Sequence, residues 1–217
     1  MMFCQDSDLL YWDSLIFTYT QVGQLVLSST GTLSDTVISV TIDLSQYDVQ
    51  AGQVAILSGA VSGQFPIQDV TSSSMTISLL SAGLIPDDGS AGHAVNPSLT
   101  TGSVAFSIRT FWQYRRIISD QLLAAAGIAP SPAGVTPTLL NPQDFKRASA
   151  LGALSLVYDA MAVANIGTSP THWQDRSDAY STLYLQAVRS IRAQLDWDGD
   201  GKADELRYLG EIVLRRE

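Results

Sequence analysis

Apolar and polar side chains alternate along residues 22–109, in short runs that are separated by Gly, Ser and Asp. The clearest alternations are formed by Ile38, Val40 and Ile42, by Met75, Ile77 and Leu79, and by Val104, Phe106 and Ile108. Further short apolar runs lie at 24–27, 54–57 and 65–70. A period of two places such side chains on one face of a strand, and the intervening residues are typical of turns. The pattern predicts about six strands in a small antiparallel β-barrel or sandwich.

The periodicity becomes helical from Phe111 onward. Apolar residues recur every three or four positions in three stretches, which lie at about 112–126, 145–163 and 173–195. Asn141 followed by Pro142 is typical of a helix start, and Gly127 of a helix end. The last apolar stripe ends with Ile191 and Leu195. A shorter amphipathic piece at 7–15 predicts one more helix near the N-terminus.

These elements predict an α+β protein in which a β-domain interrupts a helical bundle. The bundle would contain the short N-terminal helix and the three C-terminal helices. We expect four parts: 1–20 as the N-terminal helical segment of the bundle, 21–109 as the inserted β-domain, 110–200 as the helical domain, and 201–217 as a C-terminal tail.

Charge divides the chain at the same place as the periodicity. The 217 residues are 46% apolar, enough to form a core, and the net charge is −9. Residues 1–108 hold nine Asp and no Lys or Arg, whereas all 12 basic residues lie between Arg109 and Arg216. The division predicts two regions with different surroundings. The overall acidity argues against general binding to nucleic acid or to an anionic membrane.

Known targeting and catalytic patterns are missing from the sequence. No apolar run approaches the roughly 18 residues of a membrane span, and the N-terminus does not resemble a signal peptide. The single cysteine, Cys4, excludes an internal disulfide, and we expect it at a mobile terminus. His93 and His172 have no metal-ligating neighbour at a suitable spacing. We therefore expect a protein that is not an enzyme.

An Asp-rich run near the C-terminus predicts a cation site. Carboxylates at alternate positions followed by glycine let a tight loop wrap oxygens around a hard cation. The expected ligands are the side chains of Asp196, Asp198, Asp200 and Asp204 and the carbonyl of Lys202. The run resembles the calcium loops of EF-hands and thrombospondin type 3 repeats, which implies a weak, structural Ca²⁺ site.

The Asp-rich run departs from the EF-hand pattern at one position. Arg207 stands where an EF-hand has the bidentate glutamate that completes the ligand shell. The alternative interpretation is an acidic turn at the end of a helix, neutralised by Arg192, Lys202 and Arg207.

The last residues of the chain are both apolar and basic. The segment consists of Ile212, Val213, Leu214, Arg215 and Arg216. Such a segment is either frayed or docks into another chain, where it adds a strand or fills a groove.

Three helical segments together resemble the head-to-tail adaptor, or connector, proteins of tailed bacteriophages. The resemblance covers about residues 109–217. It is carried by FSIRTFWQYRRIISDQLLAAAGI, NPQDFKRASALGALSLVYDAMA and WQDRSDAYSTLYLQAVRSIRAQLDWDGDGKADE. The inserted β-domain departs from the smallest adaptors, which are nearly all helical.

The resemblance implies a virion protein of the phage neck that is made in the host cytoplasm. Adaptors form a ring, commonly of twelve copies, beneath the portal, and genomic DNA passes through its lumen. The C-terminal segment, here 212–216, would dock to the portal, and the far face would receive the next neck or tail protein. No membrane contact is implied.

Two other functions remain open from the sequence. One is a different neck or tail protein, such as a tail terminator-like subunit, which the β-domain could serve. The other is a calcium-dependent extracellular module that binds its ligand through a β-sandwich.

Overall fold

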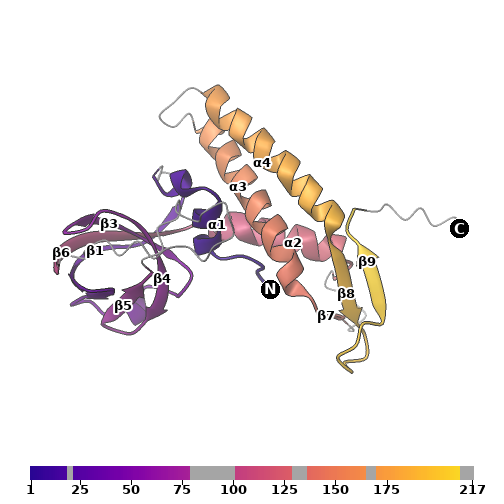
Figure 1. Ribbon diagram of the computed structural model, residues 1–217, viewed down its shortest axis with the longest axis horizontal. Helices are drawn as coiled ribbons and strands as arrows, with labels where there is room; N and C mark the ends of the chain where they lie inside the picture. The colour runs from indigo at the N-terminus through magenta and orange to yellow at the C-terminus, as the bar shows by residue number, and fades with distance from the viewer. Residues whose placement is uncertain (19–21, 79–100, 129–135, 165–169, 211–217) are drawn as a thin grey trace, which may run out of the picture. The chain divides into compact units, whose positions relative to one another are not determined.

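The computed structural model describes residues 1–18, 22–78, 101–128, 136–164 and 170–210 (Figure 1). The chain divides into two compact units. Gln5–Trp112 form one of them, here called the barrel unit. Met1–Cys4 and Gln113–Glu217 form the other, here called the helical unit. The fold is mixed α and β, as the sequence predicts.

Six antiparallel strands close the barrel in the order β1-β2-β5-β4-β3-β6. They are β1 (Gln24–Ser34), β2 (Val37–Ser39), β3 (Val54–Gly59), β4 (Gly63–Val70), β5 (Ser74–Ile77) and β6 (Gly102–Thr110). All six predicted strands are confirmed, and the sheet is a closed barrel rather than a sandwich. The alternating apolar residues in the described strands form the barrel core, where Leu33, Ile38, Met75 and Ile108 are fully buried, and Leu79 lies outside the described residues.

Long, bent strands allow the barrel to close. β1 pairs with β2 through its second half and with β6 along its length, and its register shifts between Leu25 and Leu27. β4 likewise pairs with β3 and β5, with a shift between Ile67 and Asp69. Such bulges bend a strand and increase its twist. At Gly31 a Cβ atom would lie 2.8 Å from both Ile38 Cγ2 and the Ser39 carbonyl oxygen, so only glycine fits there.

The short N-terminal helix belongs to the barrel unit and not to the helical unit, which differs from the predicted boundary at residue 20. Helix α1 (Asp6–Trp12) is held by backbone and side-chain bonds. Ser7 donates its N–H to the Gly52 carbonyl at 2.9 Å. The buried Asp6 carboxylate accepts from Thr110 Oγ1 at 2.7 Å and from the Phe111 N–H at 3.0 Å. These polar contacts are not visible in an apolar periodicity, which is why the sequence did not predict them.

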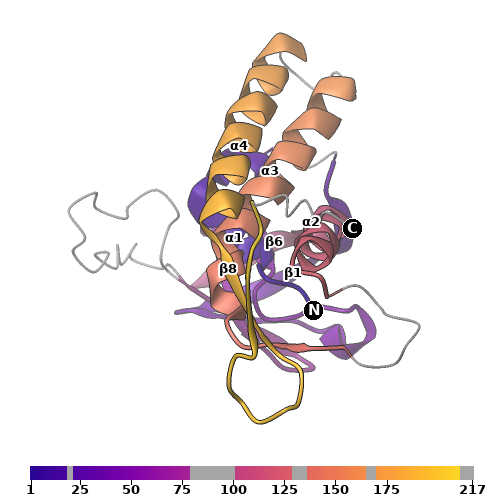
Figure 2. The same ribbon diagram turned by 90° about the vertical axis from the view of Figure 1, so that its right-hand side faces the viewer.

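Three helices make most of the helical unit. They are α2 (Trp112–Ala125), α3 (Lys146–Val163) and α4 (Pro170–Ser190). Helices α3 and α4 lie side by side in both views (Figures 1 and 2). At Gly152 of α3, a Cβ atom would meet Ile118 Cγ2 at 2.9 Å and Tyr184 Cδ2 at 3.0 Å, so α2 and α4 both approach α3 closely at this point. No helix among the described residues is long and apolar enough to span a membrane.

The helical unit also contains a three-stranded antiparallel sheet, which the sequence did not predict. It has the order β7-β8-β9, formed by β7 (Thr138–Leu139), β8 (Arg192–Asp196) and β9 (Glu205–Tyr208). The predicted extension of the last helix to Leu195 is wrong, because the helix ends at Ser190. The predicted tail from residue 201 is also wrong at its start, since β9 pairs with β8 there.

The spacing of the apolar residues explains the wrong helix end. Ile191 and Leu195 are four positions apart, as in a helix, but Ile191, Ala193 and Leu195 also alternate with period two. All three are buried. The strand conformation prevails because the following turn returns the chain and supplies β9 as a partner. The pairing is Ala193 with Arg207 and Leu195 with Glu205.

Candidate functional site

The Asp-rich run is the loop of the β8–β9 hairpin. The loop is visible beyond the ends of both strands in Figure 2. Gly199 and Gly201 have φ values of +79° and +80°, a left-handed conformation that glycine adopts without steric cost. These two glycines let the chain reverse within a short span. The turn therefore follows a strand, and the predicted turn at the end of a helix is wrong.

Three of the predicted carboxylate ligands come together in this loop. Asp196, Asp198 and Asp204 each offer one oxygen, and these oxygens all lie within 4.8 Å of one another. Asp196 is 4% exposed, whereas Asp198 and Asp204 are exposed. Three carboxylate oxygens at this separation are a partial ligand set for a hard cation such as Ca²⁺, which takes six to eight oxygens.

Asp200 lies outside this group of three. Its Oδ2 lies 3.3 Å from Lys202 Nζ, and its Oδ1 accepts the Lys202 N–H at 2.8 Å. The ligand roles of Asp200 and of the Lys202 carbonyl therefore stay predictions.

Backbone N–H groups of the loop already bind its carboxylates. Asp196 accepts from Gly199 through Oδ1 at 2.7 Å and from Gly201 through Oδ2 at 2.9 Å. Asp204 Oδ2 accepts the Trp197 N–H at 2.8 Å. These bonds shape the loop without a metal ion. Each oxygen keeps a second lone pair, so the same carboxylates can still ligate a cation.

The environment of Asp196 favours its charged form. Burial by itself raises the pKa of this carboxyl. The N–H groups of Gly201 and Gly199 act in the opposite direction and prevail, so the pKa lies below its ordinary value. Asp196 is therefore ionised throughout the neutral range and holds the loop in its folded shape.

The basic residues near the loop are engaged differently from one another. Arg207 Nε lies 2.8 Å from Glu205 Oε1, and Arg207 Nη1 donates to the Ala126 carbonyl at 3.3 Å. The Arg192 guanidinium lies 4.7 Å from the centre of the Tyr208 ring. Within the described part of the chain, Lys202 alone of these three contacts a loop aspartate. Glu205 also belongs to the acidic run, so Lys202 and Arg207 both pair with its acids, whereas Arg192 contacts the Tyr208 ring.

Asn141 is a structural residue whose role the sequence did not indicate. Its Nδ2 donates to the Arg192 carbonyl at 2.7 Å, and its Oδ1 accepts the Gln194 N–H at 2.9 Å. The side chain thus bonds the backbone of β8 as a neighbouring strand would, at residues that β7 does not pair with. Asn141 precedes the 3₁₀ turn Pro142–Phe145, as predicted for a helix start, but its side chain binds the sheet.

The cysteine, the two histidines and the predicted docking residues lie away from the Asp-rich loop or outside the described residues. Cys4 is 3% exposed, and its Sγ lies 3.2 Å from Ser149 Oγ, so the expectation of a mobile terminus is wrong. His172 is exposed and contacts the Trp173 ring edge to face, with centroids 4.8 Å apart. His93 and the predicted docking residues Ile212, Val213, Leu214, Arg215 and Arg216 lie outside the described residues.

No protein-family model, curated protein or solved structure matches the chain.

Proposed function

We propose that this chain is a structural, non-enzymatic subunit of the neck of a tailed bacteriophage. In this proposal a ring of about twelve copies joins the portal to the next neck or tail protein. The genomic DNA passes through the lumen without sequence-specific binding. The proposal rests on the resemblance of residues 109–217 to head-to-tail adaptors.

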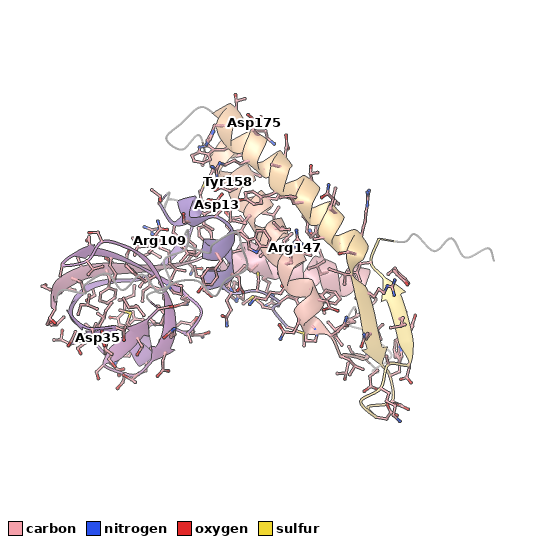
Figure 3. The ribbon with its side chains drawn as sticks, viewed as in Figure 1. Asp13, Asp35, Arg109, Arg147, Tyr158 and Asp175 are labelled. Atoms are coloured by element: carbon pink, nitrogen blue, oxygen red, sulfur yellow. The ribbon has the colours of Figure 1, made fainter. Side chains whose placement is uncertain are left out.

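The division of charge between the two units carries the proposal. The barrel unit has nine aspartates and a single basic residue, Arg109, which is labelled in Figure 3. The Arg109 guanidinium donates to the Gly23 carbonyl at 3.0 Å. A surface so poor in cations repels phosphate, which suits a protein that DNA must pass without sticking.

The helical unit supports the proposal through its exposed apolar side chains. They include Val163 at 82%, Leu206 at 58%, Leu185 at 52% and Tyr208 at 40% exposed. β9, which carries Leu206 and Tyr208, is also an edge strand of its sheet. Edge strands and exposed apolar residues are common where another chain adds to a structure. The portal and the neighbouring copies are the partners that the proposal assigns to these surfaces.

Docking to the portal is assigned to residues 212–216, which directly follow the hairpin. A deletion of residues 212–217 tests this assignment. We expect the shortened protein to keep the melting temperature of the full chain and to lose most of its co-purification with portal rings. The full chain is the control. Undiminished co-purification of the shortened protein would contradict the assignment.

The Asp-rich loop is proposed as a weak structural Ca²⁺ site in the same protein. The three clustered carboxylates support it, and the glutamate missing at Arg207 places the expected affinity at about 10⁻⁴ to 10⁻³ M. The ion would order the hairpin next to the docking segment.

Matched aspartate variants test the calcium proposal. Millimolar CaCl₂ should raise the melting temperature of the wild-type protein. Asp198→Ala with Asp204→Ala should abolish the shift, because both residues belong to the cluster. Asp200→Ala, which removes a loop carboxylate outside the cluster, should keep at least part of it. A wild-type melting temperature that is the same with and without millimolar calcium would contradict the site.

A further inference from the structure

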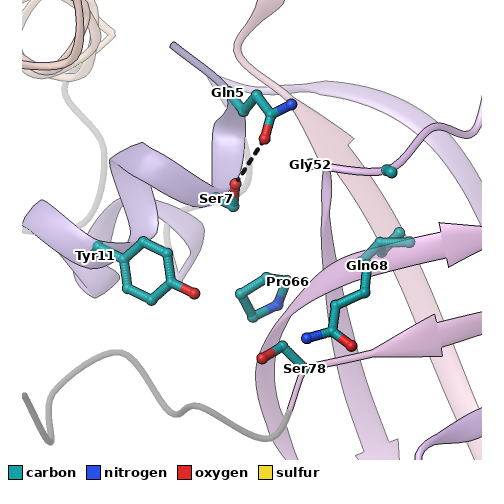
Figure 4. A pocket seen from close by; sticks show the side chains of 9 residues that line it. Gln5, Ser7, Tyr11, Gly52, Pro66, Gln68 and Ser78 are labelled. Carbon is teal, nitrogen blue, oxygen red and sulfur yellow. Dashed lines mark hydrogen bonds between the residues drawn. The ribbon is translucent and has the colours of Figure 1, made fainter. Parts of the chain in front are cut away.

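An open cleft lies within the barrel unit, between α1 and the β3–β4 side of the barrel (Figure 4). Its volume is about 380 Å³. The residues that line it are Gln5, Ser7, Tyr11, Ala51, Gly52, Pro66, Ile67, Gln68 and Ser78. Protein sites for small molecules commonly have volumes of about 300–1,000 Å³, so the cleft is large enough to hold one or two sugar-sized rings.

None of the lining residues carries a charge. The barrel unit holds nine aspartates, yet none of those in its described residues lines the cleft, and neither does its one basic residue, Arg109. A charged ligand would lose hydration on entering and would gain no opposite charge in return. The lining therefore selects for an uncharged ligand.

The polar groups of the cleft both donate and accept hydrogen bonds. They are the amides of Gln5 and Gln68 and the hydroxyls of Ser7, Tyr11 and Ser78. Within the described part of the chain, the Gln68 amide and the Tyr11 hydroxyl have no hydrogen-bond partner. Figure 4 shows the Tyr11 hydroxyl pointing toward Pro66 and Ser78. The matching ligand groups are hydroxyls, which also donate and accept.

The cleft also offers apolar surface beside these polar groups. The Tyr11 side chain is 39% exposed, and the Pro66 ring lies opposite it across the cleft (Figure 4). The face of an aromatic ring is electron-rich and attracts the partly positive C–H groups of a ligand. A sugar ring presents such C–H groups on one face and hydroxyls around its edge, which matches both parts of the lining.

The floor of the cleft is held in a fixed shape. Ser7 Oγ donates to Gln5 Oε1 at 3.5 Å, and the Ser7 N–H donates to the Gly52 carbonyl at 2.9 Å. Gly52 has a φ of +88°, and a Cβ atom there would lie 2.5 Å from Gln5 Cδ. Glycine thus lets the loop before β3 approach α1 closely. Less ordering is needed when a ligand binds to groups that are already in place.

We propose that this cleft binds a neutral saccharide of one or two rings. Tyr11 stacks against the C–H face of the sugar, and Gln68 and Ser78 bind its hydroxyls. This inference goes beyond the neck role and does not depend on it. Because the nine lining residues named above include no carboxylate, the proposed binding needs no calcium ion, unlike ligand binding by a calcium-dependent module.

Titration of the full chain with defined sugars tests the proposal. The probes are maltose, cellobiose and N,N′-diacetylchitobiose, measured by saturation-transfer NMR and isothermal titration calorimetry. We expect at least one of them to bind saturably, with a Kd on the order of 10⁻³ M. Glucuronic acid should bind at least tenfold more weakly than the best neutral probe, and EDTA should change nothing. Absence of saturable binding for all three disaccharides would overturn the proposal.

Variants locate the binding within the barrel unit. Tyr11→Ala and Gln68→Ala should each weaken binding of the best probe at least tenfold, and Tyr11→Phe should weaken it less than Tyr11→Ala. Tyr47→Ala is the matched control, since Tyr47 is 40% exposed in the same unit and does not line the cleft. Hydrogen-exchange protection of the strands confirms that each variant is folded. Full affinity in both Tyr11→Ala and Gln68→Ala would overturn the proposed site.

Discussion

The barrel unit and the helical unit differ in whether the edges of their sheets have hydrogen-bond partners. The six barrel strands close on themselves, so each strand has two neighbours. The helical unit contains an open sheet of three strands, and β9 lies at one edge of it. A closed barrel offers no strand edge to a partner, whereas an open sheet does. Among the strands of the described residues, the open edges that another chain could extend therefore lie in the helical unit.

The two units also differ in the balance of acidic and basic residues. The barrel unit has nine of the 21 acidic residues but only one of the 12 basic residues. The helical unit holds the remaining 11 basic residues and 12 acidic residues, so its charges nearly balance. A balanced surface can approach another protein without strong repulsion, and a uniformly acidic one repels polyanions. In the proposed neck protein, this difference would suit the helical unit to protein contacts and the barrel unit to the passage of DNA.

The largest expected effect is the loss of a buried aromatic side chain in the helical unit. Trp173 is fully buried and stacks on Tyr158, with ring centroids 5.7 Å apart. Trp173→Ala should lower the free energy of unfolding by about 3–5 kcal/mol. Hydrogen exchange measured by peptide should show loss of protection in α3 and α4 and unchanged protection in β1–β6.

The exposed Trp197 supplies the control for this experiment. Trp197 is 40% exposed in the same unit, so Trp197→Ala should have a much smaller effect on unfolding. Equal loss of protection in barrel and helical peptides of Trp173→Ala would contradict the division into two units.

A smaller effect is expected at the tightest point of the barrel. In Gly31→Ala the new methyl group would lie 2.8 Å from the Ser39 carbonyl oxygen, so β1 and β2 must move apart. Overpacking of this kind costs about 1–3 kcal/mol of unfolding free energy. Urea unfolding measures the change, and Ser28→Ala on the exposed face of β1 is the control. A Gly31→Ala protein as stable as wild type would show that the strands do not approach this closely.

Asn141→Ala should have a smaller effect, confined to the open sheet. The substitution removes the two hydrogen bonds from the side chain to the backbone of β8, which together contribute about 1–2 kcal/mol. Amide exchange at Gln194 should become faster, while amides of β3 in the barrel keep their rates. Gln143→Ala, at an exposed position two residues away, is the control. Unchanged exchange at Gln194 would contradict the role of Asn141.

The smallest effect concerns the pH dependence of the hairpin. Because the pKa of Asp196 is lowered in the folded protein, its contribution to stability is fully present above the unfolded value of about 3.9. The contribution is lost as the pH falls through the lower folded pKa. Carbon-detected NMR titration should place the pKa of Asp196 below the ordinary aspartate value of about 3.9. Asp196→Asn should remove the corresponding pH dependence of hairpin chemical shifts. A pKa of Asp196 at or above 3.9 would contradict the geometry of the loop.

The sequence predicted the barrel more completely than the helical unit, for a physical reason. The inward-facing residues of the barrel, such as Ile38, Met75 and Ile108, alternate with polar ones, and turn residues separate the runs. Alternation identifies strands but does not distinguish a barrel from a sandwich, because that choice depends on which strands pair, and alternation does not specify the pairing.

The candidate loop and its surroundings were predicted only in part. The acidic spacing indicated a tight loop, and two left-handed glycines form it. The spacing did not indicate that Asp204 joins Asp196 while Asp200 turns to Lys202, because hairpin pairing decides this. Ile191 and Leu195 fit a helix and a strand equally well, and tertiary pairing decided between them. The cleft beside Tyr11 arises from segments far apart in the sequence, so no local pattern could indicate it.

Cryo-electron microscopy of the full chain, mixed with a portal protein encoded in the same genome, tests the proposed neck role most directly. We expect a ring of about twelve copies seated on the portal, with an open lumen and with contacts made through the helical unit. A chain that stays monomeric and leaves the portal undecorated at micromolar concentration would contradict it.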